Sequence, residues 1–155
     1  MCVIEAYAER HGRAAVDVVQ AVYREYGFTW EAEGYHRDLY DIDGYYARRG
    51  GMFWAALVEG RVVGCAGVTV EGRQAELHRM YVFVDFRGRG IGRRLLEAAI
   101  DFARARGCAS MIIWSDVKFT AAHGLYEEFG FTRFGQRRCN DPDQALEYGY
   151  RKDAL

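Results

Sequence analysis

The chain lacks the features that mark membrane, secreted and nucleic-acid-binding proteins. Its longest apolar runs have fewer than ten residues, which is too short to cross a bilayer. Its N-terminus has no basic region followed by an apolar stretch, so we expect no secretory signal. The formal net charge is −1, which argues against non-specific nucleic-acid binding. We therefore expect a cytoplasmic protein with neither nucleic acid nor a membrane as its partner.

Clustered metal ligands are absent as well. The four cysteines and four histidines are dispersed along the chain. No two cysteines have the spacing of a metal site or of a C-x-x-C motif. We therefore expect four reduced thiols, as in an intracellular protein, and no metal site.

What is present suffices for one globular domain. The chain has 155 residues, enough to bury a core. Its residues are 50% apolar and 15% aromatic, a composition that argues against disorder. Because no linker, repeat or low-complexity segment divides it, we expect a single domain over residues 1–155.

Hydrophobic periodicity predicts helices and strands in mixed order. We expect strands over Cys2–Tyr7, Phe53–Val58, Val62–Val70, Gln74–Phe83, Met111–Trp114, Phe131–Cys139 and Gln144–Lys152. We expect helices over Ala15–Tyr26, Tyr35–Arg48, Ile91–Arg106 and Phe119–Phe129. This order predicts an α/β fold with a mixed, mostly antiparallel twisted sheet and helices on both faces. The two strands joined by the helix after position 90 should form a parallel pair.

The most informative segment is the loop 87–92, Arg-Gly-Arg-Gly-Ile-Gly, which follows a predicted strand and opens a predicted helix. The first turn of a helix has unpaired N–H groups and the positive end of the helix dipole. Glycines let a phosphate approach those groups closely, and Arg87 and Arg89 add positive charge. The segment therefore predicts an anion-binding site.

Two common phosphate-binding loops do not fit this spacing. A Walker loop requires Lys followed by Ser or Thr after its last glycine, where this chain has Arg93 and Arg94. A dinucleotide fingerprint requires a third glycine where this chain has Arg93. A nucleotide-binding signalling domain is therefore disfavoured.

The spacing Arg87-x-x-Gly90-x-Gly92 resembles the pyrophosphate loop of the GNAT superfamily of acetyl-CoA-dependent N-acetyltransferases. Residues 125–131, Leu-Tyr-Glu-Glu-Phe-Gly-Phe, resemble a second segment of that family, in the correct order along the chain. Two departures stand out, because Val84 replaces a frequent proline and Phe119 a frequent asparagine. The resemblance implies that the parallel strands splay apart and that the pantetheine arm of acetyl-CoA lies in the gap.

The resemblance also implies roles for individual residues. Tyr126 would be the general acid that protonates the departing thiolate, since a phenol stays protonated at neutral pH. A backbone N–H near Val82 would polarise the thioester carbonyl. The residues expected to bind acetyl-CoA are Met80, Tyr81, Val82, Arg87, Gly88, Arg89, Gly90, Ile91, Gly92 and Arg93.

The general base is less determined by the sequence. Glu76 precedes the apolar end of the strand that enters the loop, and a carboxylate at the matching place serves as base in some relatives. Trp114 stands where other relatives carry Glu or His, and Asp116 shares its strand face if that strand continues. We assign Glu76 to catalysis and Asp116 to substrate binding, while a solvated or ion-paired role stays open for both.

The acceptor side leaves several alternatives. Acidic residues gather between positions 25 and 43 and arginines between 87 and 106. They form either two solvated faces or an acidic acceptor end and a basic cofactor end. We expect an N-acetyltransferase with a small-molecule or peptide amine as acceptor, and a homodimer is left open. The alternative is a catalytically weak acyl-CoA-binding regulatory module.

Overall fold

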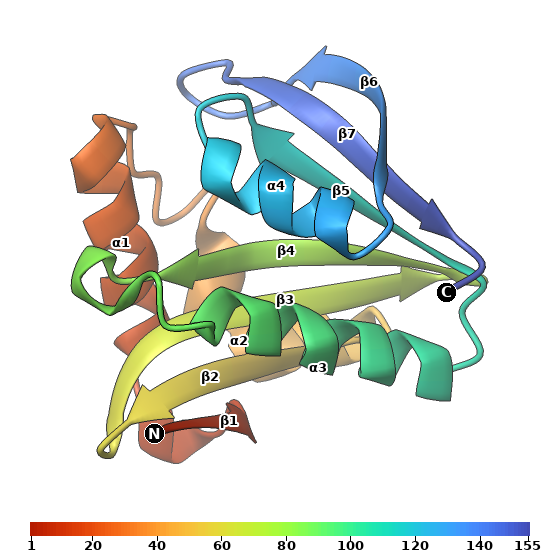
Figure 1. The fold of residues 1–155 in the computed structure, drawn as a ribbon. Coiled ribbons are helices and arrows are strands. Elements are labelled where there is room, and N and C mark those ends of the chain that lie inside the picture. The colour runs from red at the N-terminus through yellow and green to blue at the C-terminus, as the bar shows by residue number, and fades with distance from the viewer.

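The computed structural model describes residues 1–155 and places them around one seven-stranded sheet (Figure 1). The strands are β1 (Cys2–Ala6), β2 (Met52–Val58), β3 (Arg61–Glu71), β4 (Gln74–Val82), β5 (Ser110–Asp116), β6 (Thr132–Arg138) and β7 (Leu146–Asp153). The helices are α1 (Ala14–Tyr26), α2 (Ile42–Arg48), α3 (Ile91–Ala105) and α4 (Thr120–Glu128). None of them is long and apolar enough to cross a membrane.

The strand order across the sheet is β1-β2-β3-β4-β5-β7-β6. The pair β4–β5 is parallel, and every other neighbouring pair is antiparallel. The helix α3 bridges β4 and β5, as a parallel connection requires. The predicted mixed, mostly antiparallel sheet is therefore confirmed.

Helices cover both faces of the sheet, which is also as predicted. One hydrophobic core joins the sheet to α3 and α4 and includes Leu95 and Tyr126. A second core joins the opposite face to α1 and α2 and includes Val19 and Tyr46. Figure 1 shows α3 and α4 together on the near side of the sheet. Burial of these two faces is the main force that holds the layers together.

The parallel strands separate halfway along their length. β4 pairs with β5 only from Gln74 to Leu77. Just beyond, Arg79 and Met80 stand together opposite Ala66 of β3, which is a β-bulge. Arg79 has a φ of 53°, in the left-handed region that a non-glycine residue seldom adopts. Because a bulge bends its own strand, β4 continues past this point without a partner on its β5 side.

The prediction of one continuous helix over Tyr35–Arg48 is wrong. Residues Arg37–Tyr40 form a 3₁₀ turn, Asp41 is extended with a φ of −147°, and only α2 is helical. Leu39, Ile42 and Tyr46 of this segment are nevertheless buried. The helix is interrupted because Asp38 turns inward to a buried ion pair with Arg79, a tertiary contact that local periodicity does not encode.

The same segment buries a histidine that should make the fold sensitive to acid. His36 is fully buried, stacks on Trp30 with ring centroids 3.9 Å apart, and accepts a hydrogen bond from the backbone N–H of Glu31. Burial, with the nearby Arg79 guanidinium, lowers the pKa of His36 to about 4. The folded state therefore holds this imidazole neutral where an unfolded chain would protonate it.

We expect the free energy of unfolding to decrease as the pH falls from about 6.5 towards about 4. The unfolded state binds the extra proton in that window, so a shift of this size removes about 2 kcal/mol by pH 5. Urea denaturation at pH 7 and pH 5 measures the loss. The variant His36→Phe should show a smaller difference between the two pH values. An equal difference in both proteins would exclude His36 as the cause.

Candidate active site

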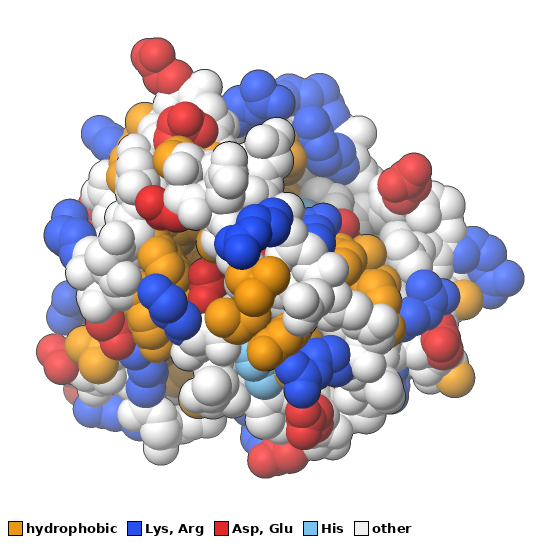
Figure 2. All heavy atoms as spheres, turned by 90° about the horizontal axis from the view of Figure 1, so that it is seen from above, with side chains coloured by type: hydrophobic (Ala, Val, Ile, Leu, Met, Phe, Trp, Pro, Cys, Tyr) orange, Lys and Arg blue, Asp and Glu red, His pale blue; other side chains and the backbone are white.

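A cavity of about 1090 Å³ opens where β4 and β5 separate. Its walls come from α1, β4, the loop before α3, β5, α4 and β7. Figure 2 shows this face, where apolar side chains gather at the centre with basic side chains around them. The cavity brings together most of the residues that the sequence singled out, although they come from distant parts of the chain.

The glycine loop forms one end of the cavity. Gly88 and Gly90 have φ values of 77° and 78°, and a Cβ atom added at either would meet no other atom within 4 Å. Gly90 begins α3 without a side-chain cap, and the first turn of that helix has no acidic residue. The first free N–H groups of a 15-residue helix therefore face an open surface. These features fit a bound pyrophosphate.

The arginines of this loop have different positions. Arg87 lines the cavity, but its guanidinium is held by Glu25 through two bonds of 2.8 Å and by the Val82 carbonyl at 3.0 Å. Arg93 also lines the cavity and pairs with Glu128. Arg89 lies outside it, bound to the Asp85 carbonyl. Arg87 thus ties the loop to α1 and to the end of β4.

The strand β4 lines the middle of the cavity with Met80, Tyr81 and Val82. Since β4 has no partner on its β5 side beyond Leu77, backbone groups of this stretch are open to an added extended chain. This is where the sequence placed the N–H group that would polarise a carbonyl. Ile91 and Gly92 of α3 line the same wall.

Tyr126 lines the cavity from α4, in the helical layer that also contains α3, and only 4% of this residue is exposed. Burial raises the pKa of its phenol, and the neighbouring Ser115 hydroxyl only partly opposes this shift. Ser115 is in turn 3.1 Å from Nε2 of His123. The Tyr126 hydroxyl is therefore a proton donor throughout the neutral range.

Glu76 of β4 lies on the opposite sheet face from α4 and lines the cavity. Its carboxylate oxygen is 3.7 Å from Nδ1 of His78, and Nε2 of His78 is 2.8 Å from the Thr69 hydroxyl. Burial and the nearby Glu147 raise the pKa of Glu76. Burial and Arg79 lower the pKa of His78 to about 4, so this imidazole is neutral. Glu76 is therefore a stronger base than an exposed glutamate.

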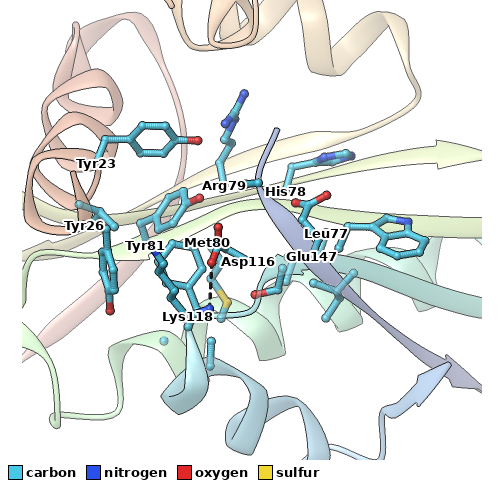
Figure 3. A pocket seen from close by; sticks show the side chains of 18 of the residues that line it. Tyr23, Tyr26, Leu77, His78, Arg79, Met80, Tyr81, Asp116, Lys118 and Glu147 are labelled. Carbon is cyan, nitrogen blue, oxygen red and sulfur yellow. Dashed lines mark hydrogen bonds between the residues drawn. The ribbon is translucent and has the colours of Figure 1, made fainter. Parts of the chain in front are cut away.

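Two further carboxylates lie across the β5–β7 ladder from each other. Asp116 is buried, pairs in register with Glu147 of β7, and accepts a hydrogen bond from the backbone N–H of Lys118 at 2.8 Å (Figure 3). Glu147 is also buried, and Nε of Arg137 donates to it at 2.9 Å. Burial raises the pKa of Glu147. Glu147 was not among the residues predicted for the site, because its position in the final hairpin carries no distinguishing signal in the sequence.

Arg79 is a second site residue that was not predicted. It lines the cavity from the bulge of β4, and its side chain is only 10% exposed. Asp38 accepts hydrogen bonds from Nε and Nη2, and the Tyr35 carbonyl accepts another from Nη2 at 2.6 Å. The bulge, rather than any sequence pattern, turns this arginine inward.

Of the acidic residues between positions 25 and 43, only Glu31 and Asp38 line the cavity. Glu25 pairs with Arg87, Asp38 with Arg79 and Asp41 with Arg48. The acids with raised pKa values in the cavity come instead from β4 and β7. Phe119, at the place of a frequent asparagine, packs against the rings of Tyr26, Phe28 and Tyr81 and makes this wall apolar.

Comparison with known proteins finds a matching family model, sequence relatives and structural neighbours. Residues 16–131 match the model of the acetyltransferase (GNAT) family. An N-acetylaspartate synthetase of Danio rerio is 38% identical over 65% of this chain and 37% of its own length. An IAA acetyltransferase of Azospirillum brasilense is 34% identical over 84% of each chain. The crystal structure of a GNAT-family acetyltransferase from Staphylococcus aureus Mu50 superposes with a TM-score of 0.86 over the whole of both chains at 20% identity.

Proposed function

The chain belongs to the acetyltransferase (GNAT) family and is an acyltransferase, and we propose that it moves an acetyl group from acetyl-CoA to a primary amine by direct attack. The observation that carries this proposal is the gap between β4 and β5. It has an uncapped helix start at one end and buried carboxylates at the other. A single cavity connects the two.

The residues at the loop suit the pyrophosphate of acetyl-CoA. The N–H groups of Ile91, Gly92 and Arg93 begin α3, and Gly88 and Gly90 leave the space beside them open. The open side of β4 at Met80, Tyr81 and Val82 offers backbone partners to the amides of a pantetheine arm. Arg87 positions the loop, and Arg89 contributes only long-range charge.

We assign the chemistry to groups that face the gap. Glu76 accepts the proton of the acceptor amine, because only the neutral amine has a lone pair for attack. A backbone N–H near Val82 donates to the carbonyl oxygen as negative charge develops there. Tyr126 gives its proton to the departing thiolate sulfur. Asp116 holds the acceptor rather than taking its proton.

The acceptor is a proposal of its own. The chain spans about a third of the length of the N-acetylaspartate synthetases that it matches, and it shares 84% of the length of the IAA acetyltransferase. The acetylated amino acid in the first name agrees with an amine acceptor that is small. The buried acids of the cavity agree with it as well, since they attract an ammonium group.

A thiol-release assay with acetyl-CoA tests the proposed function. Free thiol should appear only when a suitable amine is present, and mass spectrometry should find the acetylated amine in an equal amount. The panel should include amino acids, alkyl amines, polyamines and peptides with a free N-terminus. The alternative of a regulatory module predicts acetyl-CoA binding without release of thiol for any of them.

The glycine loop gives a prediction about cofactor binding. Gly90→Val should weaken acetyl-CoA binding by at least about tenfold, because its side chain fills the open surface at the start of α3. The variant should also be less stable, by about 1–3 kcal/mol, since Val tolerates a φ of 78° poorly. Calorimetry measures the binding and thermal unfolding the stability.

The matched control for this variant is Gly72→Val. Gly72 lies in the turn between β3 and β4, outside the cavity, has a φ of 61°, and a Cβ atom there would meet no other atom within 4 Å. This variant should lose a similar amount of stability and keep the affinity for acetyl-CoA. If folded Gly90→Val protein binds acetyl-CoA as tightly as the control, the loop does not hold the pyrophosphate.

A further inference from the structure

Three carboxylates gather in one part of the cavity. The carboxylates of Glu76, Asp116 and Glu147 come from β4, β5 and β7. Beyond them, the guanidinium of Arg79 lies towards α1 and the turn at Arg37–Tyr40. Figure 3 shows this separation, with Asp116 and Glu147 on one side and Arg79 and Tyr23 on the other. Asp38 and Arg137 line the cavity as well, where Asp38 pairs with Arg79 and Arg137 with Glu147. A ligand that fills both ends therefore meets the carboxylates of Glu76 and Asp116, which no arginine holds, at one end and the guanidinium donors of Arg79 at the other.

The guanidinium of Arg79 is not fully used by the protein. An arginine has five N–H donors, and three of them are bound, one at Nε and two at Nη2. Neither Asp38 nor the Tyr35 carbonyl uses Nη1, and the Tyr23 hydroxyl lies beside the guanidinium. Because Arg79 also lines the cavity, the two remaining donors are available to a ligand that carries acceptor oxygens.

Two tyrosine hydroxyls lie beside this guanidinium. Figure 3 shows Tyr23 and Tyr81 with their hydroxyl ends turned towards Arg79, whereas Tyr26 points away from it. Both tyrosines line the cavity, and burial raises the pKa of Tyr23 to about 12 and that of Tyr81 well above its usual value. Both hydroxyls therefore stay protonated and can donate to an anion.

We infer that the acceptor is a primary amine that also carries a carboxylate, such as a free amino acid. Arg79, Tyr23 and Tyr81 bind its carboxylate, and its ammonium group faces Glu76 and Asp116, with Glu147 beside them. Guanidinium and phenol donors match a carboxylate in geometry and charge. This inference rests on the proposed function, since it names the class of amine that the same cavity takes.

The arrangement argues against two other classes of amine. A polyamine would place a second cation beside Arg79, whose charge Asp38 already balances, and it offers no acceptor oxygen to the guanidinium and phenol donors. The N-terminus of a peptide has a neutral amide in place of the carboxylate, so it would leave buried donors without a charged partner. A site built to hydrogen-bond one group rejects analogues that lack it.

Matched pairs of acceptors test the inference directly. Each pair is an L-amino acid and its α-carboxamide, with acidic, apolar and basic side chains all represented, beside the amine that lacks the carboxyl group. We expect kcat/KM for at least one amino acid to exceed that of its amide by about a hundredfold. The amide has the less basic amine, so a preference for the acid cannot arise from easier deprotonation.

Three variants separate carboxylate binding from the rest of the site. Tyr23→Phe, Tyr81→Phe and Arg79→Lys should each lower kcat/KM for the amino acid by about tenfold to a hundredfold, mainly through KM. Arg79→Lys keeps a positive charge beside Asp38, which protects the fold. The ratio between amino acid and amide should fall in all three. Tyr26 lies on α1, as Tyr23 does, but its ring points away from Arg79. The variant Tyr26→Phe should therefore leave the ratio between amino acid and amide unchanged.

Amides or plain amines that react as well as their parent amino acids would overturn the inference while leaving the acetyltransferase intact. If no amine at all is acetylated, the proposed function fails instead. Calorimetry with the CoA-bound protein then decides the inference by itself. Binding of an amino acid that weakens about tenfold in Tyr81→Phe would support it, and binding that is absent or unchanged in the variants would overturn it.

Discussion

Tyr126→Phe should lower kcat by about 10²–10⁴-fold while leaving the affinity for acetyl-CoA nearly unchanged. The substitution keeps the ring, which packs in the core against α3, and removes only its hydroxyl. Only 4% of Tyr126 is exposed. The burial that raises the pKa of Tyr126 also disfavours a bare thiolate in the same place. A neutral phenol is therefore well suited to donate to the leaving sulfur.

Tyr150→Phe is the matched control for this prediction. Tyr150 is a buried tyrosine whose ring centroid lies 5.6 Å from that of Tyr126, and it does not line the cavity. Its loss of a hydroxyl should leave kcat unchanged. Steady-state kinetics together with calorimetry for acetyl-CoA measures both variants. If Tyr126→Phe has the same kcat as the wild type, Tyr126 only packs in the core and is not the proton donor.

Local patterns predicted most of the elements around the site. The strand, glycine loop and helix from Gln74 onwards occur in the expected order, because turn residues and apolar alternation act over a few neighbouring positions. The resemblance to the GNAT family also implied that the parallel strands separate, and β4 and β5 do so beyond Leu77. The position of the Arg87 side chain was less predictable, since its partner Glu25 lies on α1, 62 positions earlier in the chain.

The parts that sequence reasoning missed depend on contacts between distant segments. Arg79 points inward because a bulge breaks the alternation of β4, and its partner Asp38 lies 41 positions earlier in the chain. That ion pair also interrupts the helix predicted over Tyr35–Arg48. Glu147 becomes a site residue only because β7 inserts between β5 and β6, which the hairpin pattern does not reveal.

The general base is tested by the pH dependence of activity. Burial raises the pKa of Glu76. As the pH is lowered, wild-type kcat/KM should therefore begin to fall at a pH above the usual glutamate pKa of about 4.3. Glu76→Gln keeps the size of the side chain and removes the basic oxygen. It should lower kcat/KM at pH 7 by about 10²–10⁴-fold. Part of the loss should return at high pH, where the free amine is already neutral.

Two neighbouring carboxylates provide the comparison. Asp116→Asn keeps the oxygen that binds the Lys118 N–H, and it should mainly raise the KM of the acceptor. Glu147→Gln removes a carboxylate that is already paired with Arg137. The kcat/KM of this variant should therefore still fall at low pH, as in the wild type. Glu76 is the one of the three that neither an arginine nor a backbone N–H holds, which is why we assign the proton to it. A loss rescued by high pH in Asp116→Asn or Glu147→Gln, with wild-type behaviour in Glu76→Gln, would move the base to that residue.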